Sequence, residues 1–422
     1  MKKAFLLMIV LLFLVGLVPL FAGGQPGGEK EIVLQWPCIW VAQDAKAATV
    51  AALVDQFNVD NAGKIKVVIE PNPDYDGYRQ KINTMMAAGQ VPDLFVFNPD
   101  PTSFTYYEGD LLLDLTDDLK GAWGNKFAEG TIATSTRGGR VKSIPYELGL
   151  TPIWYNNELF EKAGIGEFPK TFDEFWVACD KLKAIGVTPT SQMTGGSNAW
   201  TSMLWYSHIM ASIGGPDVWS KSLSDPAYVQ AAEILLRLYS DGNTTKDAIG
   251  STAGDSSGHY LAKDTAMFIN GPWFIGNIRK NAPEVYETTD VTSAPAVKGG
   301  EYGAQIGFLL SNLAAANTDD PARRAAVIKF LQWMTEPENV KKISMDAGSL
   351  FCVKFSFDAG DDVDPLQEKF INASSNAAFI VPHFQFNYKT EVVQEFGQAL
   401  GAMALGKATP EEFVGMLQAK NK

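Results

Sequence analysis

The stretch Val141–Phe160, with the sequence VKSIPYELGLTPIWYNNELF, constrains the fold of this chain most. It predicts two short strands that meet between Pro145 and Pro152, and it leaves no room for a helix between them. Patterns of alternating strand and helix lie on both sides of this stretch. A two-lobed protein requires a short extended link of this kind at its waist, because a few residues there absorb the backbone change when the lobes close.

Three residues in this link have an expected role. Gly149 supplies backbone freedom at its centre. Glu147 and Tyr155 are expected to lie near a cleft between the lobes. The alternative is an ordinary β-hairpin within a single domain, and the rest of the chain supplies the context for choosing between the two.

The first 22 residues have the pattern of a secretory signal peptide. Lys2 and Lys3 precede an apolar run that ends at Ala22, and small and polar residues follow. We expect cleavage after Ala22, with residues 23–30 as a Gly-rich tether, although the length of the apolar run leaves an uncleaved N-terminal anchor as the alternative. Since no cysteine stands at the cleavage point, a lipid-modified signal is not expected. The mature protein is therefore expected to be periplasmic or otherwise extracytoplasmic.

Length and charge limit the classes of function. The chain has 422 residues, enough for more than one hydrophobic core, and 46% of them are hydrophobic. Its formal net charge of −13 argues against a nucleic-acid partner, because such partners are bound by basic patches on the phosphate backbone.

The first part of the mature chain predicts a β-α-β-α-β order. Short connections in that order favour a parallel sheet covered by helices, in which ligands bind beyond the carboxyl ends of the strands. The sites that this rule indicates are Trp36–Asp44 and Asn98–Ser103. The expected strands are Glu31–Trp36, Ile65–Glu70 and Asp93–Phe97, and the expected helices are Ala45–Asn58 and Tyr75–Ala88.

The rest of the chain predicts a second set of alternating elements. Two capping boxes mark helix starts, one from Thr171 to Glu174 and one from Thr409 to Glu412. The other expected helices are Asn157–Ala163, Trp200–Ser212, Asp225–Tyr239, Pro321–Met334, Glu338–Asp346 and Lys389–Leu405. The expected strands are Thr188–Met193, Thr265–Ile269, Gly303–Leu310 and Leu313–Ala316.

No catalytic or metal-binding set stands out. The three histidines are not paired at ligand spacing, and neither a Walker loop nor a nucleophile-elbow motif is present. The acidic run that ends at Asp364 lacks the spacing of an EF-hand. We therefore expect no metal, no cofactor and no enzymatic activity. Cys38, Cys179 and Cys352 are expected to be small buried hydrophobes, with one disulfide left open.

The positive signal is aromatic. Several tryptophans stand at strand ends and turns, where a buried stripe does not predict them, and acidic or amide residues stand beside them. Indole faces suit the apolar faces of a sugar ring, and carboxylates and amides suit its hydroxyl rim. The candidate ligand-binding residues are Trp36, Trp40, Asp44, Asp100, Glu147, Trp200, Asn270 and Trp273.

Several motifs along the chain resemble the extracellular solute-binding proteins (family 1) of bacterial ABC transporters, the maltose-binding-protein-like group. The resemblance covers nearly the whole mature chain. Its most specific motif is AMFINGPW, which ends at Trp273. The other motifs are MMAAGQVPD ending at Asp93, the PY…YNNELF crossover within Val141–Phe160, PKTFDEF ending at Phe175, AAVIKFLQWMTEP ending at Pro337, and GKATPEE ending at Glu412.

The resemblance implies an α/β, two-lobed periplasmic-binding-protein fold of type II-like architecture. Each lobe is expected to contain a mostly parallel sheet covered by helices, and crossover segments form the hinge. Lobe 1 is expected to comprise residues 31–149 and 303–349, and lobe 2 residues 150–302 and 350–422. By the same resemblance, Trp273 stacks on a sugar and Asp100 accepts from its hydroxyls. The charged pair that maltose-type members carry after the first strand is replaced here by Trp36-Pro-Cys-Ile-Trp40, which argues against maltose itself.

The resemblance further implies a monomeric receptor that captures a sugar and delivers it to the membrane subunits of an ABC permease. Three alternatives stay open: a receptor for glycerol phosphate or another small polar solute, a sugar-sensing subunit, and a secreted glycosidase. Cleft arginines favour an anionic solute, and the candidates for that role are Arg79, Arg137 and Arg140. A glycosidase requires paired carboxylates, and the sequence nominates no such pair.

Overall fold

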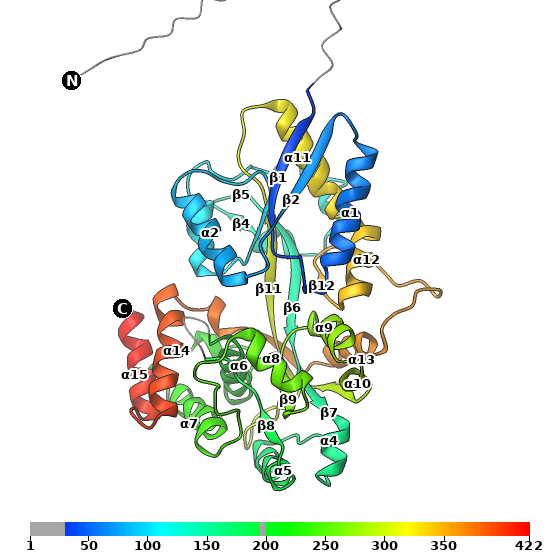
Figure 1. The fold of residues 1–422 in the computed structure, drawn as a ribbon. Coiled ribbons are helices and arrows are strands. Elements are labelled where there is room, and N and C mark those ends of the chain that lie inside the picture. The colour runs from blue at the N-terminus through cyan, green and yellow to red at the C-terminus, as the bar shows by residue number, and fades with distance from the viewer. Residues whose placement is uncertain (1–29, 195–198) are drawn as a thin grey trace, which may run out of the picture.

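The computed structural model describes residues 30–194 and 199–422. The expected signal peptide at 1–22, all but the last residue of the tether at 23–30 and the loop at 195–198 before Trp200 lie outside these residues. The described chain forms two α/β lobes, one above the other, and the strands β6 and β11 run between them at the centre (Figure 1). The two-lobed α/β fold is therefore confirmed.

The first lobe begins with the expected β-α-β unit. Strands β1 and β2 pair in parallel, with Ile32 opposite Ile65 and Cys38 opposite Pro71. The helix between them buries one apolar face, which includes Val50 and Phe57, against the sheet. The elements of this lobe are β1 (Ile32–Cys38), α1 (Ala47–Asp60), β2 (Ile65–Pro71), α2 (Tyr75–Ala87), β3 (Phe95–Phe97), the 3-10 helices η1 (Pro101–Tyr107) and η2 (Gly124–Lys126), α3 (Thr131–Thr134), β4 (Thr136–Arg137), β5 (Arg140–Val141), α11 (Pro321–Met334), α12 (Pro337–Ala347) and β12 (Leu350–Phe351).

The waist differs from the expected link. Strand β6 (Ile144–Thr151) is continuous and contains Pro145, so only Pro152 separates it from β7 (Ile153–Asn156). It pairs antiparallel with β11 (Ala304–Ala314), which is one long strand where two short ones were expected. The two strands stabilise each other because each satisfies the backbone hydrogen-bonding groups of the other along the crossing.

Gly149 has a role other than the expected backbone freedom. It lies inside β6, and a Cβ atom there would come within 2.5 Å of Phe308 Cζ. The Phe308 ring therefore lies directly over the glycine, and glycine is required for this close approach.

The second lobe contains a four-stranded sheet in the order β10-β7-β9-β8. Its 15-residue helix α6 is buried almost all round. The elements of this lobe are β7, α4 (Asn157–Lys162), α5 (Phe172–Ala184), β8 (Thr188–Thr190), α6 (Trp200–Gly214), η3 (Val218–Ser220), α7 (Pro226–Ser240), α8 (Ala253–Leu261), β9 (Thr265–Ile269), α9 (Phe274–Asn281), α10 (Pro283–Tyr286), β10 (Thr289–Thr292), α13 (Pro365–Ser375), β13 (Phe379–Pro382), η4 (Phe384–Phe386), α14 (Thr390–Ala404) and α15 (Pro410–Lys420).

The expectation of mostly parallel sheets is wrong for the described strands. The pairs β1–β2, β8–β9 and β11–β13 are parallel, but β11 pairs antiparallel with β3 and β6, and β7 pairs antiparallel with β9 and β10. The crossing strands β6 and β11 run in opposite directions through the waist, and in the four-stranded sheet β7 runs opposite to both of its neighbours. Sequence periodicity does not specify this direction.

The two capping-box motifs in the sequence predicted helix starts correctly. Both predicted capping boxes are present: the side chain of Thr171 accepts a hydrogen bond from the Glu174 amide, and Thr409 does the same for Glu412.

Tyr155 was expected near the cleft. Its ring packs in the second lobe, with its centroid 5.0 Å from those of Phe160 and Phe168, because it lies in β7 beyond the crossing.

Each lobe has its own large hydrophobic cluster. The cluster of the first lobe includes Phe330 and also Phe351 and Val353, which follow α12. The expected boundary at 149/150 falls inside β6, and the lobe boundaries as a whole stay a prediction. All three cysteines are buried and free.

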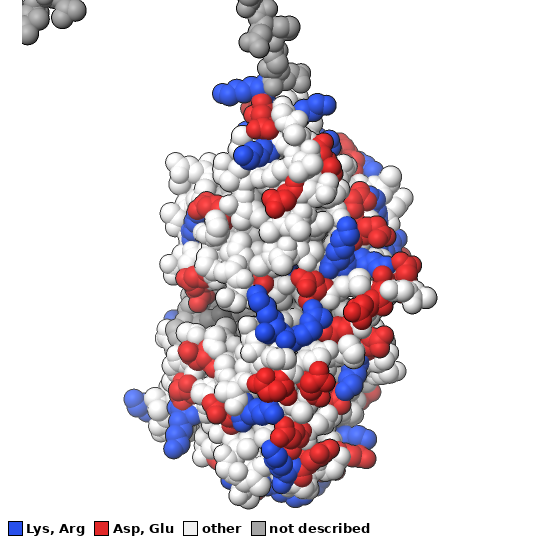
Figure 2. Space-filling view, turned by 45° about the vertical axis from the view of Figure 1, so that its right-hand side comes forward, with Lys and Arg blue, Asp and Glu red and all other residues white. Residues whose placement is uncertain are grey.

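Two further properties concern the surface. Among residues 30–194 and 199–422, no helix combines the length and the apolar character needed to cross a bilayer. On the face shown in Figure 2, Lys and Arg side chains are interspersed with Asp and Glu, and an uncharged area covers part of the first lobe.

Candidate functional site

A cavity of about 280 Å³ lies between the two lobes. Its lining comes from the first lobe, from the crossing strands β6 and β11, and from the second lobe. Seven of the eight residues predicted for a binding site line it: Trp40, Asp44, Asp100, Glu147, Trp200, Asn270 and Trp273.

Trp36 is the predicted residue that does not line the cavity. Its side chain is 1% exposed and packs edge-on against Trp40 and Phe330, at centroid distances of 5.9 Å and 5.4 Å. The difference between the two tryptophans follows from their positions. Trp36 lies within β1 and faces the helix layer, whereas Trp40 lies two residues beyond the end of the strand.

A buried ion pair borders the cavity on the first-lobe side. Lys46 Nζ donates to Glu147 Oε1 at 3.3 Å and lies 3.7 Å from Asp44 Oδ1. Burial opposes the charge of Lys46, but the charges of Asp44 and Glu147 outweigh it and raise the pKa of the ammonium. On β11, Ser311 Oγ donates to the other Glu147 oxygen at 3.5 Å. The ion pair therefore links the loop after β1 to the crossing strand.

Asp100 forms a second polar region of the lining. It caps η1, and its Oδ1 accepts hydrogen bonds from the amide and the hydroxyl of Thr102. Its Oδ2 lies 3.7 Å from Arg79 Nη2 and accepts a hydrogen bond of 2.9 Å from Gln385 Nε2. Because Gln385 comes from η4 of the second lobe, this hydrogen bond joins the two lobes directly across the cavity.

Aromatic side chains cover the second-lobe side. The Trp200 and Trp273 rings lie 5.9 Å apart at an interplanar angle of 42°, and Phe308 stacks on Phe386 at 5.1 Å. Trp273 lies so close to Gly271 that a Cβ atom there would come within 2.1 Å of the indole. The backbone turn after β9 is thus shaped to receive this ring.

Asn270 is held in place by the same turn. Its backbone carbonyl accepts a hydrogen bond of 2.9 Å from the indole of Trp154, and its side-chain oxygen accepts one of 2.8 Å from the amide of Gly271. The Asn270 amide group is therefore oriented by its own turn, at the carboxyl end of β9.

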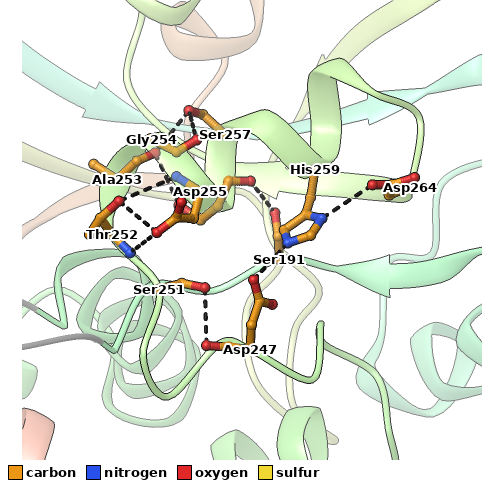
Figure 3. Close-up of polar contacts among 11 residues, drawn as sticks. Ser191, Asp247, Ser251, Thr252, Ala253, Gly254, Asp255, Ser257, His259 and Asp264 are labelled. Carbon is orange, nitrogen blue, oxygen red and sulfur yellow. Dashed lines mark hydrogen bonds and ion pairs between the residues drawn. The ribbon is translucent and has the colours of Figure 1, made fainter.

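The helix α8 presents its first turn to the cavity through Ala253 and Ser256. A capping box between Thr252 and Asp255 satisfies the backbone amides of these two residues at this end of the helix. Farther along, the two ring nitrogens of His259 lie 2.9 Å from Asp247 Oδ2 and 3.3 Å from Asp264 Oδ2 (Figure 3). The hydrogen bond that His259 donates to Asp247 makes the largest contribution to raising the pKa of His259, and the one to Asp264 adds to it.

Of the three arginines named as candidates for binding an anion, only Arg79 lines the cavity. Arg137 lies over the ring of Phe104, and Arg140 lies near Asp110 at the surface.

Several lining residues were not predicted. Lys46 stands two residues after the predicted Asp44, so proximity could have indicated it. No sequence signal marks the others, because their positions depend on tertiary packing. They include Tyr75, Tyr106, Phe308, Phe386 and Gln385.

The arrangement combines flat apolar rings with hydrogen-bonding groups from both lobes. Such a cavity can hold a small polar ring by stacking and by hydrogen bonds to its rim. Among the residues that the structure describes, no group of three or more His, Cys, Asp or Glu side chains is placed to hold a metal ion.

Comparison with known proteins connects this geometry to a family. The family described as bacterial extracellular solute-binding protein matches residues 42–341, more than half of the chain. The chain belongs to this family. It is a family of solute-binding receptors, as the motifs around Trp273 and the crossover indicated.

Individual relatives of this solute-binding protein are distant. A protein of Brucella abortus named as a binding protein is 25% identical over 252 residues, which is 58% of this chain and 60% of the length of that relative. The diacetylchitobiose-binding protein of Streptomyces coelicolor is 27% identical over 262 residues, which is 59% of this chain and 58% of the length of that relative. The multiple sugar-binding protein of Streptococcus mutans is 24% identical over 324 residues, 73% of this chain and 72% of its own.

Solved structures share the fold over most of the chain. A protein from a study of xylan utilization by Caldanaerobius polysaccharolyticus has a TM-score of 0.83 at 22% identity and covers 93% of this chain and all of its own. A chitin oligosaccharide binding protein has a TM-score of 0.82 at 22% identity, with 92% of this chain and 98% of its own covered. These likenesses support the two-lobed architecture.

Proposed function

We propose that this solute-binding protein captures an uncharged sugar, a mono- or oligosaccharide, in the cavity between its lobes and delivers it to the membrane subunits of an ABC permease. The observation that carries this proposal is the pairing of Trp200 and Trp273 on one lobe with the buried carboxylate of Asp100 on the other. A sugar ring that lies on the indoles would place its hydroxyls within reach of Asp100 and Glu147. Contacts with both lobes would then favour the closed form.

The names of relatives support a sugar as the ligand. Diacetylchitobiose, multiple sugars and chitin oligosaccharides appear in them. One relative with a different ligand is the sn-glycerol-3-phosphate-binding periplasmic protein of Brucella abortus, which is 24% identical over 291 residues. An anionic solute is thus the second candidate.

The charges of the lining favour the uncharged sugar. Two cations, Lys46 and Arg79, and three carboxylates line the cavity, so its formal charge is one unit negative. Lys46 lies between two of the carboxylates, and Arg79 faces the third, Asp100. A phosphate would have to compete with these carboxylates for either cation, at a cost in Coulomb energy.

The proposal includes no bond-breaking step. Asp44 and Glu147 share Lys46, and Asp100 is held by Thr102 and Gln385. A glycosidase would instead need one carboxyl group free to donate a proton and a second one to act as base or nucleophile.

We also propose that the protein acts as a monomer outside the cytoplasm, after export by a signal peptide at residues 1–22. A sugar-sensing subunit would use the same cavity and differ only in its membrane partner.

Calorimetric titration of Trp273→Ala tests the proposal. We expect the purified protein to release or absorb heat with at least one neutral sugar from a panel of maltose, raffinose, diacetylchitobiose and xylo-oligosaccharides, and none with sn-glycerol 3-phosphate. Trp273→Ala should lower the affinity by tenfold or more, because aromatic stacking and buried area are lost. The matched control is Trp333→Ala, which removes a half-buried tryptophan of the first lobe outside the cavity. Unchanged sugar affinity in Trp273→Ala, or binding of the phosphate alone, would contradict the proposal.

A further inference from the structure

The hydrogen bond from Gln385 Nε2 to Asp100 Oδ2, at 2.9 Å, spans the cavity. Both residues line the cavity, and they come from opposite lobes, 285 positions apart in the chain. Since a bond to a carboxylate is stronger than one between neutral groups, this contact contributes to holding the lobes together.

Asp100 is fixed within the first lobe. Its side chain is 3% exposed, and its Oδ1 is occupied by the amide and hydroxyl of Thr102. Its own amide donates to the carbonyl of Asn98 at 2.8 Å, and Ser103 Oγ donates to the Asp100 carbonyl at 2.9 Å. The carboxylate therefore presents Oδ2 toward the second lobe in a defined position.

Gln385 is presented just as firmly by the second lobe. Its neighbour Phe384 is fully buried, and the Phe384 amide donates to Ser207 Oγ at 3.0 Å. On the other side, Phe386 stacks on Phe308. The short helix η4 is thus anchored at both ends, and the amide between the two anchors reaches Asp100.

We propose that Gln385 is a positioning residue that holds Asp100 across the cleft and so maintains a population of closed, ligand-free protein. This inference rests on the proposed function, because it concerns closure of the lobes around that cavity. A ligand that binds only the closed form has an apparent affinity proportional to the fraction of closed protein. Gln385 would therefore raise affinity for every ligand of the cavity, including ligands that do not touch it.

The capacity of Asp100 to accept one more hydrogen bond is consistent with this role. A carboxylate oxygen can accept about two hydrogen bonds. The Oδ2 atom accepts one from Gln385, while Arg79 at 3.7 Å is beyond hydrogen-bond distance. One ligand hydroxyl can therefore donate to Oδ2 while the bond to Gln385 is kept, so closure and ligand binding need not compete for this atom.

The test is the distance between the lobes in solution. Spin labels at Val59→Cys on the first lobe and Val177→Cys on the second report it, because both positions are exposed and the three native cysteines are buried. Gln385→Glu keeps the size of the side chain but places a second carboxylate against Asp100. Gln398→Glu, at an exposed position of α14, is the control for the added charge.

Without ligand, we expect the unsubstituted protein and the control variant Gln398→Glu to show a population with a short distance between the labels. We expect Gln385→Glu to lose this population. We also expect Gln385→Glu to bind the sugars of the calorimetric panel about tenfold more weakly, with an unchanged distance at saturation. Identical distance distributions in the ligand-free proteins would overturn the inference. If the distance shifts in Gln385→Glu but no sugar binds to the unsubstituted protein, the closure contact stands and the proposed function fails. If a sugar binds to the unsubstituted protein but the distance does not shift in Gln385→Glu, the proposed function stands and the inference about Gln385 fails.

Discussion

Lys46 Nζ lies 3.3 Å from Glu147 Oε1, and the two side chains are 5% and 2% exposed. Lys46 directly precedes α1 in the first lobe, whereas Glu147 lies in β6, which crosses between the lobes. The pair therefore links one lobe to the waist of the molecule. A charge that is buried as deeply as this is strongly destabilising when it loses its partner.

Removing one partner of this pair should destabilise the protein. We expect Glu147→Leu to lower the free energy of unfolding by about 3 kcal/mol, because Lys46 keeps only the more distant Asp44. The double variant Lys46→Met/Glu147→Leu should recover most of the loss, since no uncompensated charge stays buried. Urea unfolding measures both. A single variant as stable as the unsubstituted protein would show that the pair has no structural role.

Gly271 should control the position of Trp273. In Gly271→Ala, the new methyl group would lie 2.1 Å from the indole, so the ring must move from its place beside Trp200. We expect about tenfold weaker sugar binding. Gly166→Ala is the control, because a Cβ atom at Gly166 meets nothing within 4 Å. Equal affinity in the two variants, measured by calorimetry, would mean that the indole position does not matter for binding.

The two capping boxes and the arrangement of the cavity show what could be predicted from the sequence. A capping box is local, so Thr171 and Glu174 sufficed to place a helix start. The rule that ligands bind beyond the carboxyl ends of strands led to Trp40, Asp44 and Asp100, and all three line the cavity. Trp36 failed the same rule because the side on which a strand residue points depends on the layer it packs against.

Other features could not be predicted because they depend on segments far apart in the chain. Phe308 lies over Gly149 only through the antiparallel pairing of β11 with β6, and that pairing has no signature in either segment. Gln385 reaches Asp100 only when both lobes are in place. The sequence therefore predicted the two-lobed fold and much of the cavity lining, but not the strand directions or the contact between lobes.

Acid should destabilise the protein through two buried histidines. Burial lowers the pKa of His208 to about 4, and burial together with the charge of His208 lowers the pKa of His383 to about 3. Their pKa values in the unfolded chain are near 6.5, so below that pH the unfolded state binds more protons and stability falls as pH decreases toward 4. Each histidine can contribute a slope of about 1.4 kcal/mol per pH unit.

The variant His383→Phe tests this pH dependence. The imidazole packs among Trp200, Phe308 and Phe386, which a phenyl ring can also contact. We expect urea unfolding of His383→Phe at pH 7, 6, 5 and 4 to show a smaller loss of stability than the unsubstituted protein. Identical slopes in the two proteins would exclude His383 as a source of the acid sensitivity.

His259 should act in the opposite direction. Its pKa is raised by Asp247 and Asp264, so its contribution to stability is fully present below about pH 6.5 and is lost as pH rises through the pKa of the folded state. The side chain is 27% exposed, and we expect a contribution of no more than about 1 kcal/mol. Unfolding at pH 6 and pH 9 measures it. His259→Gln should lose this difference, and an unchanged difference would show that folding does not change the pKa of His259.

The most direct measurement is a crystal structure of the protein with a sugar that gives heat in the calorimetric panel. We predict a pyranose ring against Trp273 and Trp200, with hydroxyl hydrogen bonds to Asp100 from the opposite lobe. A sugar bound outside the cavity, or held by residues of one lobe alone, would contradict the account.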